Sequence, residues 1–144
     1  MGLIDATTAP ARFTLAERTR LAAEIGWIYV RVRRLLRRHD LPSTLAALRR
    51  HRAAASRLPP SDPNLDVRLA RAVVLTLDRV PADARCLAQS LVLTRLLAVR
   101  GIATTFVIGV SEPGEAFGAH AWVEREGVPL LPAGGAAQRR LTEL

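Results

Sequence analysis

Residues 83–97 read DARCLAQSLVLTRLL and contain the only cysteine of the chain, Cys86. Drawn as a helix, this segment is apolar around much of its circumference, which is typical of a central helix. We expect it to run from about residue 84 to residue 100, with Asp83 as N-cap and Gly101 as C-terminal glycine. Cys86 would then occupy the third helical position.

Upstream of this segment the sequence predicts three more helices, over about residues 14–38, 43–56 and 63–80. Thr14 and Glu17 have the spacing of a capping box at the start of the first helix. The tripeptide 41–43, Leu-Pro-Ser, is expected to separate the first two. Asp62 and Pro63 are residue types favoured at the N-cap and first position of the third.

Downstream of Gly101 the residues become β-branched and aromatic, and strands are expected over 104–108, 119–124 and 128–131. Glu126-Gly127 fits a two-residue hairpin turn. Helices followed by antiparallel strands predict an α+β fold. Within a single domain, we expect an N-terminal helical region, 1–60, to pack on or precede a core of residues 61–144.

The composition indicates a globular chain, with 49% hydrophobic and 24% charged residues among 144. A single cysteine cannot form an internal disulfide, which fits a cytoplasmic location. The sequence shows neither a signal peptide nor an apolar run long enough to span a membrane.

All 21 basic residues besides histidine are arginines, and the net charge is +8. Nucleic acid, acidic lipid and an acidic protein partner are all compatible with this charge. The arginines are scattered and aromatics make up only 4%, so nucleic acid has little support. The basic helix over 14–38 is either a packing helix with a solvated face or an amphipathic helix in peripheral contact with a membrane or partner.

Cys86 has two interpretations from its position alone. It is either a small buried hydrophobe or a nucleophile whose pKa is lowered by the N–H groups of a helix N-terminus. The same N–H groups could contribute to an oxyanion hole. Position does not choose between these two interpretations.

His120 favours the nucleophile. It heads a predicted strand directly after a glycine-bearing loop, whereas His39 and His51 lie in arginine-rich helical segments. A thiol and an imidazole are the minimal pair for cysteine hydrolase or acyl-transfer chemistry. The alternative is a structural histidine bonded to backbone.

Strand alternation places His120, Trp122 and Glu124 on one face. Trp122 would line the active site or belong to the core. One cysteine and three scattered histidines offer no metal-ligand spacing, and we expect neither a metal nor another cofactor. No phosphate-binding glycine loop is present in the sequence.

Two stretches, CLAQSLVLTRLLAVRGIATTFVIGV at 86–110 and FGAHAWVEREG at 117–127, resemble the transglutaminase-like leader peptidase of lasso-peptide biosynthesis. The shared pattern is a CL-x-x-S-L-x-L helix ending at R-G, an IGV strand, and then A-H-A-W-V-E. The resemblance implies a papain/transglutaminase-like core in which Cys86 attacks the bond between leader and core peptide and His120 transfers the proton. It also implies a winged-helix-like leader-recognition protein and an asparagine-synthetase-like cyclase as partners.

The chain departs from this family pattern at two positions. Gln89 stands where members often carry arginine, and Pro132 stands where the third triad residue, an aspartate, usually lies. Hairpin pairing places about Ala133 opposite His120, so no carboxylate is expected there. Glu124 lies on the histidine's own strand face but about 7 Å along it, so we expect it to orient His120 poorly unless a bulge intervenes. The pattern predicts a working but slow dyad, or an unorthodox third residue.

Three other functions remain open from the sequence. One is an amide hydrolase or acyltransferase that acts on a small molecule without a recognition partner. Another is a weakly active or non-catalytic homologue that acts as a scaffold in a maturation complex. The last is a basic helical nucleic-acid binder.

Overall fold

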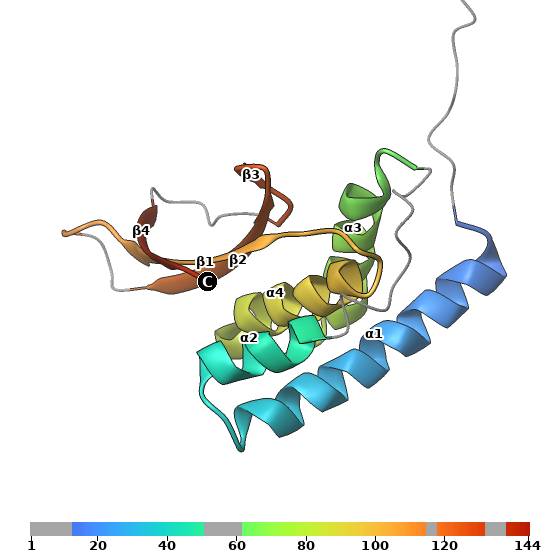
Figure 1. Cartoon of the computed structure of the whole chain (residues 1–144), viewed down its shortest axis with the longest axis horizontal. Helices are drawn as coiled ribbons and strands as arrows, with labels where there is room; N and C mark the ends of the chain where they lie inside the picture. Colours follow the sequence, from blue (N-terminus) through green and yellow to red (C-terminus); the bar gives the residue numbers. More distant parts are fainter. Residues whose placement is uncertain (1–12, 51–61, 115–117, 132–137) are drawn as a thin grey trace, which may run out of the picture.

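The computed structural model describes residues 13–50, 62–114, 118–131 and 138–144. In these residues four helices precede a four-stranded sheet, which confirms the predicted α+β fold. Figure 1 shows the helices gathered on one side of the sheet. The expected boundary near residue 60 falls outside the described residues.

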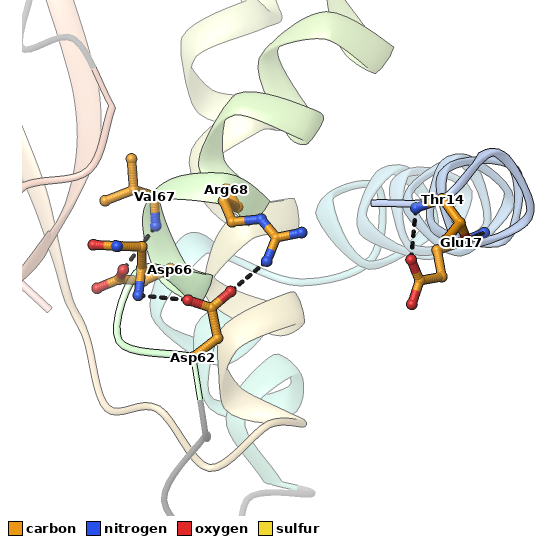
Figure 2. A network of polar contacts seen from close by, with 7 residues as sticks. Thr14, Glu17, Asp62, Asp66, Val67 and Arg68 are labelled. Atoms are coloured by element: carbon orange, nitrogen blue, oxygen red, sulfur yellow. Dashed lines mark hydrogen bonds and ion pairs between the residues drawn. The ribbon is translucent and has the colours of Figure 1, made fainter. Parts of the chain in front are cut away.

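Helix α1, Leu15–Leu36, begins with the predicted capping box. The Thr14 hydroxyl accepts a hydrogen bond from the Glu17 N–H at 3.2 Å, and the Thr14 N–H donates to the Glu17 carboxylate at 2.7 Å (Figure 2). Apolar residues at spacings of four and three form the face that α1 buries, through Leu21, Ile25, Ile28 and Val32.

Helix α2, Leu41–Arg49, starts earlier than the sequence predicted. Asp40 is its N-cap, and the Asp40 carboxylate accepts a hydrogen bond from the Ser43 N–H at 2.8 Å. Pro42 is tolerated in this first turn because the N–H that it lacks would have no partner inside the helix. The tripeptide 41–43 therefore begins a helix instead of breaking one. The predicted end of this helix, residues 51–56, lies outside the described residues.

Helix α3, Leu65–Leu77, starts two residues later than predicted. Its N-cap is Asn64, and no side chain caps it. The Asp62 carboxylate instead accepts a hydrogen bond from the Asn64 N–H at 2.9 Å and pairs with Arg68 (Figure 2). Because Asp62 folds over this turn, Pro63 precedes the helix. The helix ends before Pro81, as predicted.

Helix α4, Ala82–Ala98, is the centre of the molecule and packs against α1, α2, α3 and strand β2. Its side chains with almost no exposed surface include Leu91, Val92, Leu93, Leu96 and Leu97. Gly101 follows it with a φ of 75°, a left-handed conformation that suits glycine at a helix end. The prediction of a central helix closed by this glycine is confirmed.

The predicted start of α4 was wrong. Pro81 is the N-cap, with φ −51° and ψ 140°, and no side chain caps the helix. Proline fixes φ near this value and leaves an extended ψ accessible, so the chain enters the helix directly after it. Asp83 therefore lies inside the first turn, and Cys86 is the fifth helical residue instead of the third.

The sheet has the order β3-β2-β1-β4, and all its pairings are antiparallel. Its strands are β1 Thr105–Ser111, β2 Ala119–Arg125, β3 Val128–Pro129 and β4 Gln138–Glu143. Glu126 and Gly127 have φ values of 52° and 79° and join β2 to β3. Two left-handed residues are what a tight hairpin of this kind requires, so the predicted turn is confirmed.

Two features of the sheet differ from the prediction. Strand β3 is shorter than the expected 128–131, since Pro129 has no N–H to donate, although the Leu130 N–H still donates to the Val123 carbonyl at 2.8 Å. Strand β4 was not predicted, because its sequence, QRRLTE, is rich in charges. It pairs with β1 and makes that strand central.

Several arginines connect elements that are distant in sequence. Arg49 donates to the carbonyl of Leu144 at 2.9 Å and thereby joins α2 to the end of the chain. Arg100, just beyond α4, makes a two-pronged contact with Glu24 on α1 at 3.1 and 2.9 Å. These side chains hold the fold together, so the high arginine content does not by itself indicate a nucleic-acid surface.

Candidate active site

The thiol of Cys86 lies in the second turn of α4 and is partly exposed. The N–H groups without partners inside a helix are those of its first four residues, here 82–85. The electrostatic effect of a helix terminus falls off within that turn. Cys86 therefore lies farther from the unpartnered N–H groups than a residue at the predicted third position would. A nearby base then becomes more important for the reactivity of the thiol.

A buried hydrogen bond joins the helix of Cys86 to the strand of His120. The Ser90 hydroxyl, one turn after Cys86, donates to the carbonyl oxygen of Ala121 at 3.0 Å. Ser90 has no exposed surface. Residues four apart share a helix face, and Ala121 directly follows His120. The contact therefore holds the middle of α4, one turn after Cys86, against β2 at the residue that follows His120.

His120, Trp122 and Glu124 form a connected row on β2, as strand alternation predicted. The rings of His120 and Trp122 are stacked, with centroids 6.1 Å apart and planes at 24°. The indole N–H of Trp122 donates to a carboxylate oxygen of Glu124 at 2.8 Å. Trp122 is only 3% exposed, so it is a core residue and at the same time a neighbour of His120.

Arg140 on β4 completes this row by forming an ion pair with Glu124. Gly109 on β1 pairs with both His120 and Arg140, so a residue without a side chain lies between them in the sheet. Burial alone would raise the pKa of Glu124, but the hydrogen bonds from Trp122 and Arg140 and the charge of Arg140 outweigh it and lower that pKa. Glu124 is thus held as a carboxylate.

A model of the transglutaminase-like superfamily matches residues 26–144, which include the second half of α1, α2, α3, α4 and the whole sheet. The chain belongs to the transglutaminase-like superfamily. No curated protein and no solved structure matches it significantly. Membership of this superfamily is compatible with a cysteine peptidase or an acyltransferase.

For two of the positions singled out in the sequence, Gln89 and Pro132, the described residues show no defined role. Gln89 lies on α4, is partly exposed and makes no side-chain hydrogen bond with any described residue. Pro132, with Ala133, lies outside the described residues, so the position opposite His120 stays a prediction. The observed partners of Glu124 are Trp122 and Arg140.

Sequence reasoning missed two residues of this transglutaminase-like site. Ser90 could have been recognised as a hydroxyl on the apolar side of a central helix, where a buried polar group needs a partner. Arg140 gave no usable signal, because the strand that carries it was not predicted.

The described residues contain neither a group of metal ligands nor a membrane-spanning helix. Among them, no three His, Cys, Asp or Glu side chains are grouped so that they could bind a metal ion. Of the helices in the described ranges, none is both long and apolar enough to cross a membrane.

Proposed function

We propose that this protein is a cysteine peptidase that removes the leader from a ribosomally made lasso-peptide precursor before the macrolactam is closed. Cys86 is the nucleophile and His120 is the general acid and base. The proposal combines the superfamily membership with the motif pattern of residues 86–127, which resembles the leader peptidases.

The observation that carries the proposal is the contact between Ser90 and Ala121 at 3.0 Å. Cys86 precedes Ser90 by one helical turn, and His120 precedes Ala121 by one residue. The chain turns back between α4 and β1, so these two elements run in roughly opposite directions (Figure 1). Strand β2 is antiparallel to β1, so α4 and β2 run in similar directions. Both residues therefore lie on the same side of this contact, which supports their use as a pair.

In the first half of the reaction, His120 accepts the thiol proton and the Cys86 thiolate attacks the scissile carbonyl carbon. The tetrahedral intermediate then collapses, and the C–N bond breaks. His120 gives its proton to the departing amine of the core peptide. The leader remains bound to Cys86 as a thioester.

In the second half, His120 removes a proton from water, and the resulting hydroxide attacks the thioester carbonyl. The C–S bond breaks, the leader leaves with a new carboxylate, and the thiol of Cys86 is restored. The net reaction is hydrolysis of one peptide bond, and it requires no cofactor.

On β2, Trp122 and Glu124 restrain the orientation of His120 without the aspartate that is usual in the family. Arg140 and the indole of Trp122 hold the Glu124 carboxylate, and the same indole is stacked on the imidazole. Stacking against a fixed ring restricts the rotation of His120. We assign Trp122 and Glu124 as positioning residues, since they act through His120.

The proposed partners follow from the family resemblance. A small winged-helix-like protein presents the leader, and an asparagine-synthetase-like cyclase uses the released amine of the core peptide. The proposed location is the cytoplasm, where such precursors are made. Activity without the recognition protein is expected to be low.

The test is cleavage of the precursor peptide in the presence of the recognition protein, followed by mass spectrometry. Cys86→Ala and His120→Ala are each expected to lower kcat/KM by at least about a thousandfold. His39→Ala, which changes an exposed histidine at the end of α1, should leave the rate unchanged. Cleavage that persists in both active-site variants would rule out this mechanism.

An acyltransferase is the second candidate, because the superfamily is compatible with it and the thioester is common to both reactions. An amine would then attack the thioester in place of water. Adding a primary alkylamine to the cleavage assay separates the two functions, because such an amine attacks a thioester only slowly unless the enzyme binds it. A peptidase gives chiefly the free acid of the leader, whereas an acyltransferase gives chiefly the amine adduct.

A further inference from the structure

A groove of about 720 Å³ runs between α1 and α3, away from the candidate active site. Among the residues that the structure describes, its lining comes from Phe13, α1 and α3, and none of them belongs to α4 or to the sheet. The residues that matter here are Arg18 and Ala22 on α1 and Val67, Arg71, Ala72 and Leu75 on α3.

The groove has apolar side chains that the fold leaves uncovered. Val67 and Leu75 are 57% and 64% exposed. They are two turns apart on α3, about 12 Å along its axis, with Arg71 between them on the same face. Ala22 and Ala72 are small, so they leave room between the two helices. A hollow of this shape and length suits the apolar side of two or three helical turns.

The charges of the groove are all positive. Arg18 and Arg71 are exposed, and neither guanidinium forms a hydrogen bond or ion pair with any described residue. Arg68 is different, because Asp62 holds it (Figure 2). It also lies over the ring of Phe13, 3.9 Å from the ring centroid. None of the described residues that line the groove carries a carboxylate. One unpaired cation on each helix faces any occupant.

We propose that this groove docks a partner protein through an acidic amphipathic helix. The apolar side of that helix covers Val67 and Leu75, and its flanking carboxylates pair with Arg18 and Arg71. The proposal does not rest on the proposed peptidase activity. Because no residue of the sheet or of α4 lines the groove, the partner would bind without covering Cys86 or His120.

Other occupants fit the groove less well. A second copy of this chain brings a net charge of +8, so its charge opposes that of the groove. Nucleic acid would pair with the arginines but would leave the apolar side chains uncovered. The first twelve residues of this chain carry one acidic residue, Asp5, and one basic residue, Arg12, and offer no excess of negative charge.

The test uses the full chain and a fluorescein-labelled helical peptide with leucines at alternate spacings of three and four and glutamates elsewhere. Fluorescence anisotropy measures its binding against two control peptides, a scramble of the same composition and a version with every glutamate replaced by lysine. We expect the chain to bind the acidic amphipathic peptide at least about tenfold more tightly than either control, a difference of about 1.4 kcal/mol.

Two variants locate the binding, and a third controls for overall charge. R18E/R71E and V67D/L75D should each weaken binding at least about tenfold. R34E/R79E makes the same change in net charge with exposed arginines outside the groove, and should weaken binding much less. Circular dichroism confirms that each variant is folded, which is expected because all six residues are exposed.

Four results would overturn the proposal. The first is equal binding of the acidic peptide and its scramble, or no binding at about 1 mM protein. The second is an equal loss of affinity in R18E/R71E and R34E/R79E. The third is self-association in sedimentation velocity that V67D/L75D abolishes, which would make a second copy the occupant. The fourth is a large gain in affinity in L3D/I4D, which would make the chain's own N-terminal segment the occupant.

Discussion

The indole N–H of Trp122 donates to the buried carboxylate of Glu124 at 2.8 Å, and the same indole is stacked on His120. Glu124 is only 6% exposed and is also paired with Arg140. The carboxylate of Glu124 has both the indole and the guanidinium of Arg140 as partners. This network fixes the orientation of the indole ring. This relationship joins the stability of the sheet to the orientation of the proposed catalytic histidine.

Removing the Glu124 carboxylate should therefore lower both stability and activity. Glu124→Ala leaves the buried indole N–H and the guanidinium of Arg140 without their acceptor, which should cost about 1–3 kcal/mol of unfolding free energy. Urea denaturation measures this loss. In the precursor assay kcat should fall more than KM rises, because the orientation of His120 changes and not the binding of substrate.

Glu143→Ala is the matched control for this change. Glu143 also pairs with Arg140, at 2.8 Å, but its side chain is 54% exposed. Exposed pairs contribute little, so the variant should lie within about 0.5 kcal/mol of wild type. Equal losses of stability in Glu124→Ala and Glu143→Ala would show that the buried row does not have the assigned role.

Glu124 should also make stability depend on pH in the acidic range. Its folded-state pKa lies below the ordinary value of 4.5, so its charge stabilises the fold at pH values above 4.5. That contribution is lost as the pH falls from 4.5 through the lowered folded pKa. Glu124→Gln cannot titrate, so its stability deficit relative to wild type should be largest at neutral pH and shrink below pH 4.5. A deficit that stays constant from neutral to acidic pH would contradict this assignment.

The sequence determined the helical half and the first two strands well because their signals are local. The stripe from Leu21 to Val32 and the glycine at 101 specify elements through spacing and backbone preference. The errors fell at helix starts. At Pro81, backbone geometry outweighed the capping preference of Asp83, and at Asp62 a turn took up the carboxylate.

The candidate site was only half predictable from the sequence. The motif around Cys86 and His120 indicated the reactive groups. The hydrogen bond of Ser90 that connects their two elements depends on how α4 packs on β2, which the sequence does not show. Glu124 was expected to be a poor orienter from its distance along the strand. Its observed partners are the neighbouring indole and Arg140, and Arg140 lies on a strand with no recognisable sequence signal.

Ser90→Ala should separate the position of the nucleophile from global stability. The variant leaves the Ala121 carbonyl without its donor and lets α4 shift against β2. We expect a loss of about 1–2 kcal/mol in unfolding free energy and at least about a tenfold fall in kcat. Stopped assays of leader cleavage, with KM determined separately, measure the effect on kcat.

Thr94→Ala is the control for Ser90. The Thr94 hydroxyl is also buried, but it donates within the helix, to the Ser90 carbonyl at 2.8 Å. Its removal should lower stability without changing kcat, since no hydrogen bond between α4 and β2 is lost. If both variants slowed cleavage equally, the hydrogen bond between Ser90 and Ala121 would not be what positions Cys86.

The ion pair between Asp66 and Arg125 should stabilise the packing of α3 beside the sheet. The two groups lie 2.9 Å apart, and the Asp66 side chain is only 10% exposed. Asp66→Ala leaves the arginine without its carboxylate and should cost about 1–3 kcal/mol by urea denaturation. Asp78→Ala, which removes a longer pair at 3.5 Å with a side chain 72% exposed, should cost less than about 0.5 kcal/mol. A larger loss for Asp78 than for Asp66 would refute this account.

Two glycines should respond to the same substitution with opposite signs. An added Cβ would have no heavy atom within 4 Å at Gly26 or at Gly127, so neither change creates a clash. Gly26 is inside α1, where alanine should stabilise the protein by about 0.5–1 kcal/mol. Gly127 has φ 79°, a left-handed conformation in which alanine should cost about 1–2 kcal/mol. Thermal unfolding of Gly26→Ala and Gly127→Ala should therefore move the Tm in opposite directions, and a shared direction would mean that backbone conformation does not decide either effect.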